Sequence, residues 1–133
     1  MVYFAYFHSI MSYAILLWGK AASIEQIFIL QKRAIRAIYK LRSRETLRDK
    51  FKEIGILTVA SQYIYSNVVF IRNNISAYKQ NFDITNRQTR KMHQLVTPSY
   101  RLSKVKRSFM GRGVQFYNKI PKLIRDLPRS EEP

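Results

Sequence analysis

The stretch that decides the fold lies at the N-terminus, where residues 2–18 read VYFAYFHSIMSYAILLW and carry no formal charge. This length is marginal for crossing a bilayer, and His8, Ser9 and Ser12 weaken the case further. No basic residue precedes the stretch, so it lacks the pattern of a signal peptide. We therefore expect residues 2–18 to form a buried helix that is covered on most sides.

The next stretch, residues 23–45, reads SIEQIFILQKRAIRAIYKLRSRE and predicts an amphipathic helix. Its basic side chains fall mostly on the side opposite the apolar residues. The apolar residues recur at helical spacing and form one stripe: Ile24, Ile27, Phe28, Ala34, Ile35, Ile38 and Leu41.

The remainder of the chain continues with helical patterns and one interruption. Pro98 and weak alternation favour an extended segment near residues 92–103. Further helices are expected over residues 44–54, 58–74, 107–118 and 121–127. The predicted fold class is therefore mainly α, an irregular bundle of five or six helices with one extended segment.

A change of composition suggests how the chain is organised. Residues 76–90 are polar and predict a linker or long loop. Residues 1–75 would then hold the apolar helix and the basic helices. Residues 91–133 would form a basic C-terminal extension that packs on the same core.

Composition narrows the possible chemistry. The 133 residues contain 24 Lys and Arg against 8 Asp and Glu, a net charge of +16, which favours a polyanionic partner. With no Cys, the chain has no disulfide, thiolate zinc site or thiol nucleophile. The adjacent acids, Glu131 and Glu132, stand at the C-terminus, and no carboxylate set suggests a two-metal centre. We expect no catalytic residue, bound metal or cofactor in this chain alone, and an intracellular location in the nucleus or cytoplasm.

Positive charge is concentrated in two segments. Residues 32–52 hold nine basic side chains, and residues 87–112 hold eight with no acid among them. Such clusters neutralise phosphates and gain affinity by counterion release. The alternative interpretation is a solvated charged face. The predicted phosphate contacts are Lys32, Arg33, Arg36, Lys40, Arg42 and Arg44, followed by Arg101, Lys104, Lys106 and Arg107.

Several stretches together resemble one protein family. Residues 3–19, YFAYFHSIMSYAILLWG, are followed by ILQKRAIRAI at residues 29–38. TRKMHQLVTPSYRLSKVKRSF at residues 89–109 precedes FYNKIPKLIRDLP at residues 116–128. In this order they resemble the region after the catalytic palm in reverse transcriptases of non-LTR retrotransposons, particularly the jockey-like group of insects. The matching positions include Ser9, Tyr13, Trp18, Gly19, Leu30, Gln31, Lys32, Arg33 and Ile38.

The resemblance implies a fragment of an RNA-directed DNA polymerase. The part present corresponds to the thumb and post-thumb segment, which hold RNA or an RNA–DNA hybrid beside the active site. The family's Mg-binding carboxylates lie on the palm, and no position of this chain matches them. The missing palm domain is then an expected partner.

Two other function classes and a remnant origin remain open. The chain could be an element remnant without a selected function, or an interaction module whose residues 2–18 dock on the missing palm. An exposed apolar patch around Phe4, Phe7 and Met11 would favour the interaction module. A binder of anionic membranes, using the apolar helix and the basic segment together, is the third and least favoured class.

Overall fold

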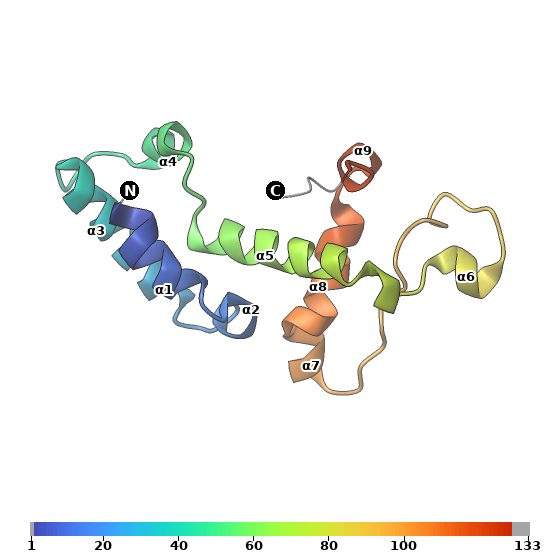
Figure 1. Cartoon of the computed structure of the whole chain (residues 1–133). Helices are drawn as coiled ribbons and strands as arrows, with labels where there is room; N and C mark the ends of the chain where they lie inside the picture. Colours follow the sequence, from blue (N-terminus) through green and yellow to red (C-terminus); the bar gives the residue numbers. More distant parts are fainter. Residues whose placement is uncertain (1, 129–133) are drawn as a thin grey trace. The chain divides into compact units, whose positions relative to one another are not determined.

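The computed structural model describes residues 2–128, and this part of the chain is mainly helical, which confirms the predicted fold class (Figure 1). Within these residues there is no β-strand, only an isolated antiparallel bridge between Gln80 and Leu95. The helices in order are η1 (Tyr3–His8), α1 (Ser9–Ser12), α2 (Ile15–Trp18), α3 (Ile24–Tyr39), α4 (Arg48–Ile54), α5 (Val59–Asn73), η2 (Ile75–Ala77), α6 (Asn81–Thr85), α7 (Ser103–Arg107), α8 (Phe109–Lys119) and α9 (Lys122–Arg125).

The helices are more numerous and shorter than the sequence patterns predicted. The stretch at residues 2–18 is divided into η1, α1 and α2, and the polar segment at residues 76–90 contains α6. The range expected to be extended, residues 92–103, is non-helical up to Leu102: residues 92–94 are turn and bend, residues 96–100 are neither helix nor strand, and α7 begins at Ser103.

The chain divides into two compact units between Ser66 and Asn67, inside α5. The N-terminal unit has a core of buried Tyr3, Ile35, Leu47, Phe51 and Ile56. The C-terminal unit has a core of buried Ile71, Leu95, Val114 and Tyr117. The polar segment at residues 76–90 lies wholly within the C-terminal unit.

The prediction that residues 2–18 form one buried helix is wrong. Tyr3, Met11 and Ile15 are buried, whereas Ile10 is 77% and Tyr13 81% exposed. The first half forms a π-helical turn and a short α-helix that lie against α3, so only one face of this half is covered. The remaining apolar side chains stay at the surface of the N-terminal unit.

A backbone turn interrupts this segment after Ser12. Tyr13 is extended, and Ala14 adopts a left-handed conformation with φ of 50°. The indole Nε1 of Trp18 donates to the carbonyl oxygen of Tyr13 at 2.8 Å, which holds the turn closed. Gly19 then contacts the ring of Tyr63 so closely that an added Cβ would collide with it. Trp18 and Gly19 are therefore packing residues in this fold.

A buried glutamine joins three segments of the N-terminal unit. Gln31 is fully buried, and its Nε2 donates to the Tyr3 hydroxyl at 2.7 Å and to the Leu57 carbonyl oxygen at 2.8 Å. Its Oε1 accepts from the Val59 backbone N–H at 3.1 Å, an amide of the first turn of α5 that has no intrahelical partner. Burial raises the pKa of the Tyr3 hydroxyl, and the hydrogen bond from Gln31 opposes that shift in part.

The C-terminal unit is organised around α8. The side-chain amide of Asn118 accepts from the Leu95 N–H and donates to the Leu95 carbonyl oxygen, both at 2.9 Å. This pair fixes the extended segment against α8. Gly111 and Gly113 of α8 are both buried. They permit close approach, since a Cβ on Gly111 would overlap the backbone of Lys106.

Candidate nucleic-acid interface

Part of the first basic cluster gathers around one hollow of the N-terminal unit. This hollow, of about 510 Å³, is called the basic hollow. It is lined by α3, the connection to α4, α4 itself and Thr58. Its lining residues are Phe28, Lys32, Arg36, Arg44, Glu45, Thr46, Leu47, Arg48, Phe51 and Thr58.

The structure divides the six predicted contacts of this cluster into two groups. Lys32, Arg36 and Arg44 line the basic hollow. The other three, Arg33, Lys40 and Arg42, are exposed and do not line it. Arg48 also lines the hollow, although it was not among the predicted contacts. The sequence signal for Arg48 was its place in the basic run at residues 32–52, but only the turn before α4 brings it toward α3.

Local hydrogen bonds shape that turn. Lys40 ends α3 in a left-handed conformation, with φ of 52°. The Arg42 N–H donates to the Glu45 Oε2 at 2.9 Å, and the Glu45 N–H donates to the Arg42 carbonyl oxygen at 3.1 Å. Arg36 Nη2 donates to the Glu45 carbonyl oxygen at 3.3 Å, so this guanidinium ties α3 to the turn. The turn therefore sets which basic side chains face the hollow.

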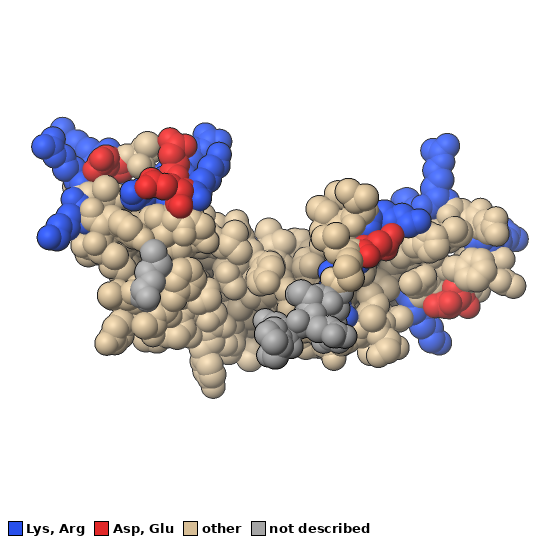
Figure 2. All heavy atoms as spheres, turned by 45° about the horizontal axis from the view of Figure 1, so that its top comes forward, with Lys and Arg blue, Asp and Glu red and all other residues tan. Residues whose placement is uncertain are grey.

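Few of the positive charges are neutralised within the protein. Among residues 2–128 the only ion pair joins Lys50 Nζ to Glu53 Oε1 at 3.1 Å. Lys32 Nζ lies 4.2 Å from the ring centroid of Phe28, a distance that gives a cation–π attraction. Figure 2 shows Lys and Arg side chains gathered where α3 ends and α4 lies, with acidic side chains among them, while the neighbouring surface is uncharged.

The second predicted cluster lies in the C-terminal unit. Lys104, Lys106 and Arg107 belong to the five-residue helix α7, and Arg101 precedes it in a bend. All four side chains are exposed, and none has an ion pair within the described part of the chain. They are available to phosphates, and α7 gathers them on a short surface segment.

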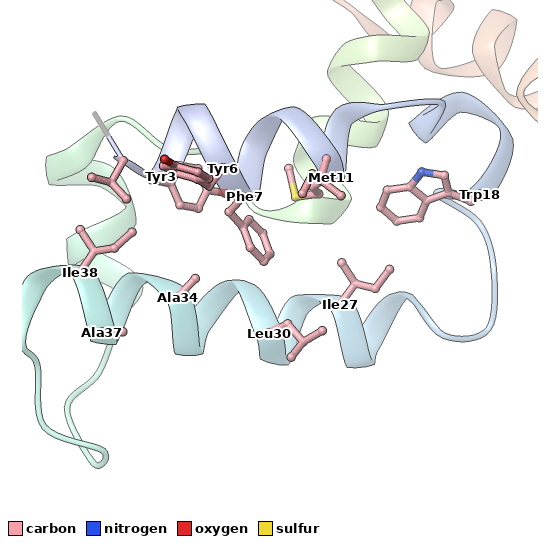
Figure 3. Close-up of a pocket in the computed structure, with 12 residues that line it drawn as sticks. Tyr3, Tyr6, Phe7, Met11, Trp18, Ile27, Leu30, Ala34, Ala37 and Ile38 are labelled. Atoms are coloured by element: carbon pink, nitrogen blue, oxygen red, sulfur yellow. The ribbon is translucent and has the colours of Figure 1, made fainter.

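An open apolar groove occupies the other face of α3. It has a volume of about 720 Å³ and is called the apolar groove. Figure 3 shows Phe7 and Trp18 pointing from the first segment toward α3, while Ile27 and Ile38 point back. The lining residues are Val2, Tyr3, Tyr6, Phe7, Ile10, Met11, Trp18, Ile27, Leu30, Ala34, Ala37 and Ile38.

The exposed patch expected around Phe4, Phe7 and Met11 differs in its members. Phe4 is 43% exposed and Phe7 half-buried, but Met11 is buried. The most exposed large side chains of the first segment are instead Tyr6, Ile10, Tyr13 and Leu17. The sequence pattern indicated an apolar surface but did not identify which residues form it.

Within residues 2–128 no group of three or more His, Cys, Asp or Glu side chains could hold a metal ion. No single helix of this part has the length and apolar composition to cross a membrane. Only α4 and α5 taken together meet that test, with a bend of 43° between them.

Comparison with known proteins adds no assignment. No family model matches the chain, and no curated protein or solved structure is significantly similar to it.

Proposed function

We propose that this chain binds RNA or an RNA–DNA hybrid through phosphate contacts and does not read the bases. The observation that carries the proposal is uncompensated positive charge. The net charge is +16, and the described residues contain a single ion pair. Positive side chains without partner carboxylates are free to neutralise phosphates, and the counterions released from the nucleic acid make binding favourable.

The resemblance to non-LTR retrotransposon reverse transcriptases gives this binding a context. As a thumb and post-thumb fragment, the chain would grip nucleic acid in the nucleus or cytoplasm while the palm domain performs the chemistry. The proposal assigns no catalytic residue and no cofactor to this chain. The Mg of the parent polymerase would be held by palm carboxylates that have no counterpart here.

The test is the salt dependence of binding to a single-stranded RNA, measured by fluorescence anisotropy. Replacing Lys104, Lys106 and Arg107 together by Gln removes three exposed charges from α7. On a single strand, each phosphate contact contributes about 0.7 to the steepness of log affinity against log salt. If each of the three side chains meets one phosphate, their loss should flatten the slope by about 2. RNAs of different sequence should weaken equally.

The matched control removes three exposed charges outside both clusters, by replacing Lys20, Lys79 and Lys119 with Gln. This variant should keep the original slope. An equal change in both triple variants would mean that net charge, and not the α7 cluster, attracts the RNA. No binding by the unmodified chain at low salt would refute the proposed function.

A second role is favoured by the apolar groove. Its lining is apolar, and several lining side chains, Tyr6, Ile10 and Leu30 among them, are exposed, as on a surface that another protein covers. The partner that we propose for it is the palm domain of a related polymerase. Replacing Leu30 and Ala34 with Lys should abolish co-purification with such a palm but leave RNA affinity no weaker. Association with anionic liposomes in a flotation assay, lost in the same variant, would favour the membrane alternative instead.

A further inference from the structure

The basic hollow carries more charge than one phosphate of a continuous backbone needs. Four cationic side chains line it, Lys32, Arg36, Arg44 and Arg48, together with one carboxylate, Glu45. The Glu45 Oε2 accepts the Arg42 backbone N–H and forms no ion pair with the lining cations. The excess charge of the lining is therefore about three, from four cations and one acid.

The cations of the hollow retain donors for a ligand. The Nε of Arg36 is buried without an acceptor among the described residues, and its Nη2 reaches the Glu45 carbonyl oxygen, so any donor that Arg36 offers a ligand lies on its Nη atoms. Arg44 and Arg48 are exposed and form no ion pair within residues 2–128. A guanidinium presents its donors as a planar fork, which matches the oxygens of a phosphate.

The shape of the hollow also bears on the ligand. Its volume of about 510 Å³ lies in the range of small-molecule sites, and the rings of Phe28 and Phe51 form part of its wall. An internal phosphodiester carries one charge and is flanked by sugars on both sides, so it suits an open track. A phosphomonoester carries a charge of about −1.5 to −2 at neutral pH and is flanked on one side only.

We propose that the basic hollow binds a phosphomonoester, the terminal phosphate of a nucleic-acid strand or of a nucleotide. Lys32, Arg36, Arg44 and Arg48 contact the phosphate oxygens, and the attached nucleoside extends toward solvent. The strand-end form of this inference rests on the proposed function, since three of these side chains are also predicted backbone contacts. The phosphate site itself does not depend on the proposed function.

The test compares two RNAs of identical sequence, one with a 5′-phosphate and one with a 5′-hydroxyl, by fluorescence anisotropy with the full chain. The phosphorylated RNA should bind about tenfold more tightly, the ratio that roughly one charge-assisted hydrogen bond supplies. Replacing Arg44 and Arg48 with Gln should bring this ratio to one. Both side chains line the hollow, and neither forms a side-chain hydrogen bond or ion pair within residues 2–128.

The matched control replaces Arg33 and Arg42 with Gln, which removes the same charge from exposed positions outside the hollow. This variant should weaken both RNAs equally and keep the ratio. A ratio of one in the unmodified chain, with both RNAs bound, would refute the strand-end site but leave the proposed function standing. Loss of the ratio in the control variant as well would refute the hollow as the site.

A second measurement covers the case in which neither RNA binds and the proposed function fails. Inorganic phosphate and a nucleoside 5′-monophosphate are then titrated separately, and the Tm of the chain is followed. Either ligand should raise the Tm of the unmodified chain and of the Arg33 and Arg42 variant, but not of the Arg44 and Arg48 variant. A nucleotide that shifts the Tm more than phosphate identifies a nucleotide site. No shift with either ligand would overturn the phosphomonoester site.

Discussion

Replacing Gln31 with Leu should be among the most damaging single substitutions in the N-terminal unit. Gln31 is fully buried and forms three hydrogen bonds, with the Tyr3 hydroxyl, the Leu57 carbonyl oxygen and the Val59 N–H. Leucine has a similar volume and helix propensity, so the substitution removes the polar groups without opening a large cavity or weakening α3. The effect then measures the network itself.

The magnitude follows from the partners left behind. Tyr3 and Val59 are both fully buried, and each buried group without a partner costs about 1–3 kcal/mol. Leu57 is 44% exposed, so water can replace the lost donor at its carbonyl oxygen. The sum is about 2–6 kcal/mol, and the apolar burial of leucine offsets part of it. We expect a loss of about 2–4 kcal/mol in the free energy of unfolding.

The assay is urea unfolding followed by the fluorescence of Trp18, the single tryptophan of the chain, which lies in the N-terminal unit. The control is Gln26→Leu, because Gln26 is exposed on the same helix and its side chain forms no hydrogen bond to another segment of the described residues. This control should change the stability by no more than about 0.5 kcal/mol. If Gln31→Leu falls within 0.5 kcal/mol of the control, the network does not stabilise the fold.

Three further substitutions test other contacts. Asn118→Ala should remove both hydrogen bonds to Leu95, each 2.9 Å long, and lower the free energy of unfolding by about 2–3 kcal/mol. Hydrogen exchange at the Leu95 amide should accelerate, and unchanged exchange would contradict this role. Gly111→Ala would place a Cβ 2.9 Å from the Cα of Lys106, so we expect the free energy of unfolding in urea to fall by about 1–3 kcal/mol. A gain in stability would show that α7 can move away. Burial raises the pKa of the Tyr3 hydroxyl above the usual tyrosine value of 10.0. The stability that the neutral hydroxyl provides is therefore complete below pH 10 and is lost as the pH rises above it. Tyr3→Phe should reduce this alkaline loss, and an unchanged pH profile would count against it.

The sequence predicted the long helices because their packing follows from periodicity. The apolar stripe of α3 recurs at helical spacing, and Ile35 from that stripe is buried in the core. A helix was predicted over residues 58–74, and at its start the Thr58 Oγ1 accepts from the Ser61 N–H at 3.3 Å, as a capping residue does. These features depend on residues within a few positions of one another, which is why a sequence pattern can reveal them.

The interruption at Tyr13 and Ala14 could not be predicted in the same way. Residues 2–18 contain neither Pro nor Gly, and uniform hydrophobicity gives no periodicity that would reveal a bend. The left-handed backbone at Ala14 persists because Trp18 donates to the Tyr13 carbonyl oxygen, a contact between side chain and backbone. Contacts of this kind are specified by the folded geometry and not by composition.

The basic site was predictable as a segment but not as an arrangement. Charge alone selected residues 32–52, and the structure gathers Lys32, Arg36 and Arg44 around the basic hollow. The selection of these three and the addition of Arg48 depend on the left-handed end of α3 at Lys40 and on the turn that follows. A one-dimensional charge pattern contains no information about which side chains such a turn brings together.

Four of the residues that support the family resemblance have structural roles in this chain. Trp18 closes a turn, Gly19 permits close packing, Gln31 joins three segments, and Asn118 fixes Leu95 against α8. Matches at these four positions concern packing and carry no information about chemistry. It follows that the proposed phosphate contacts must be tested on their own side chains. A variant that loses RNA binding through Gln31 or Asn118 would report a lost fold, whereas the charge variants of α7 and of the basic hollow report the interface.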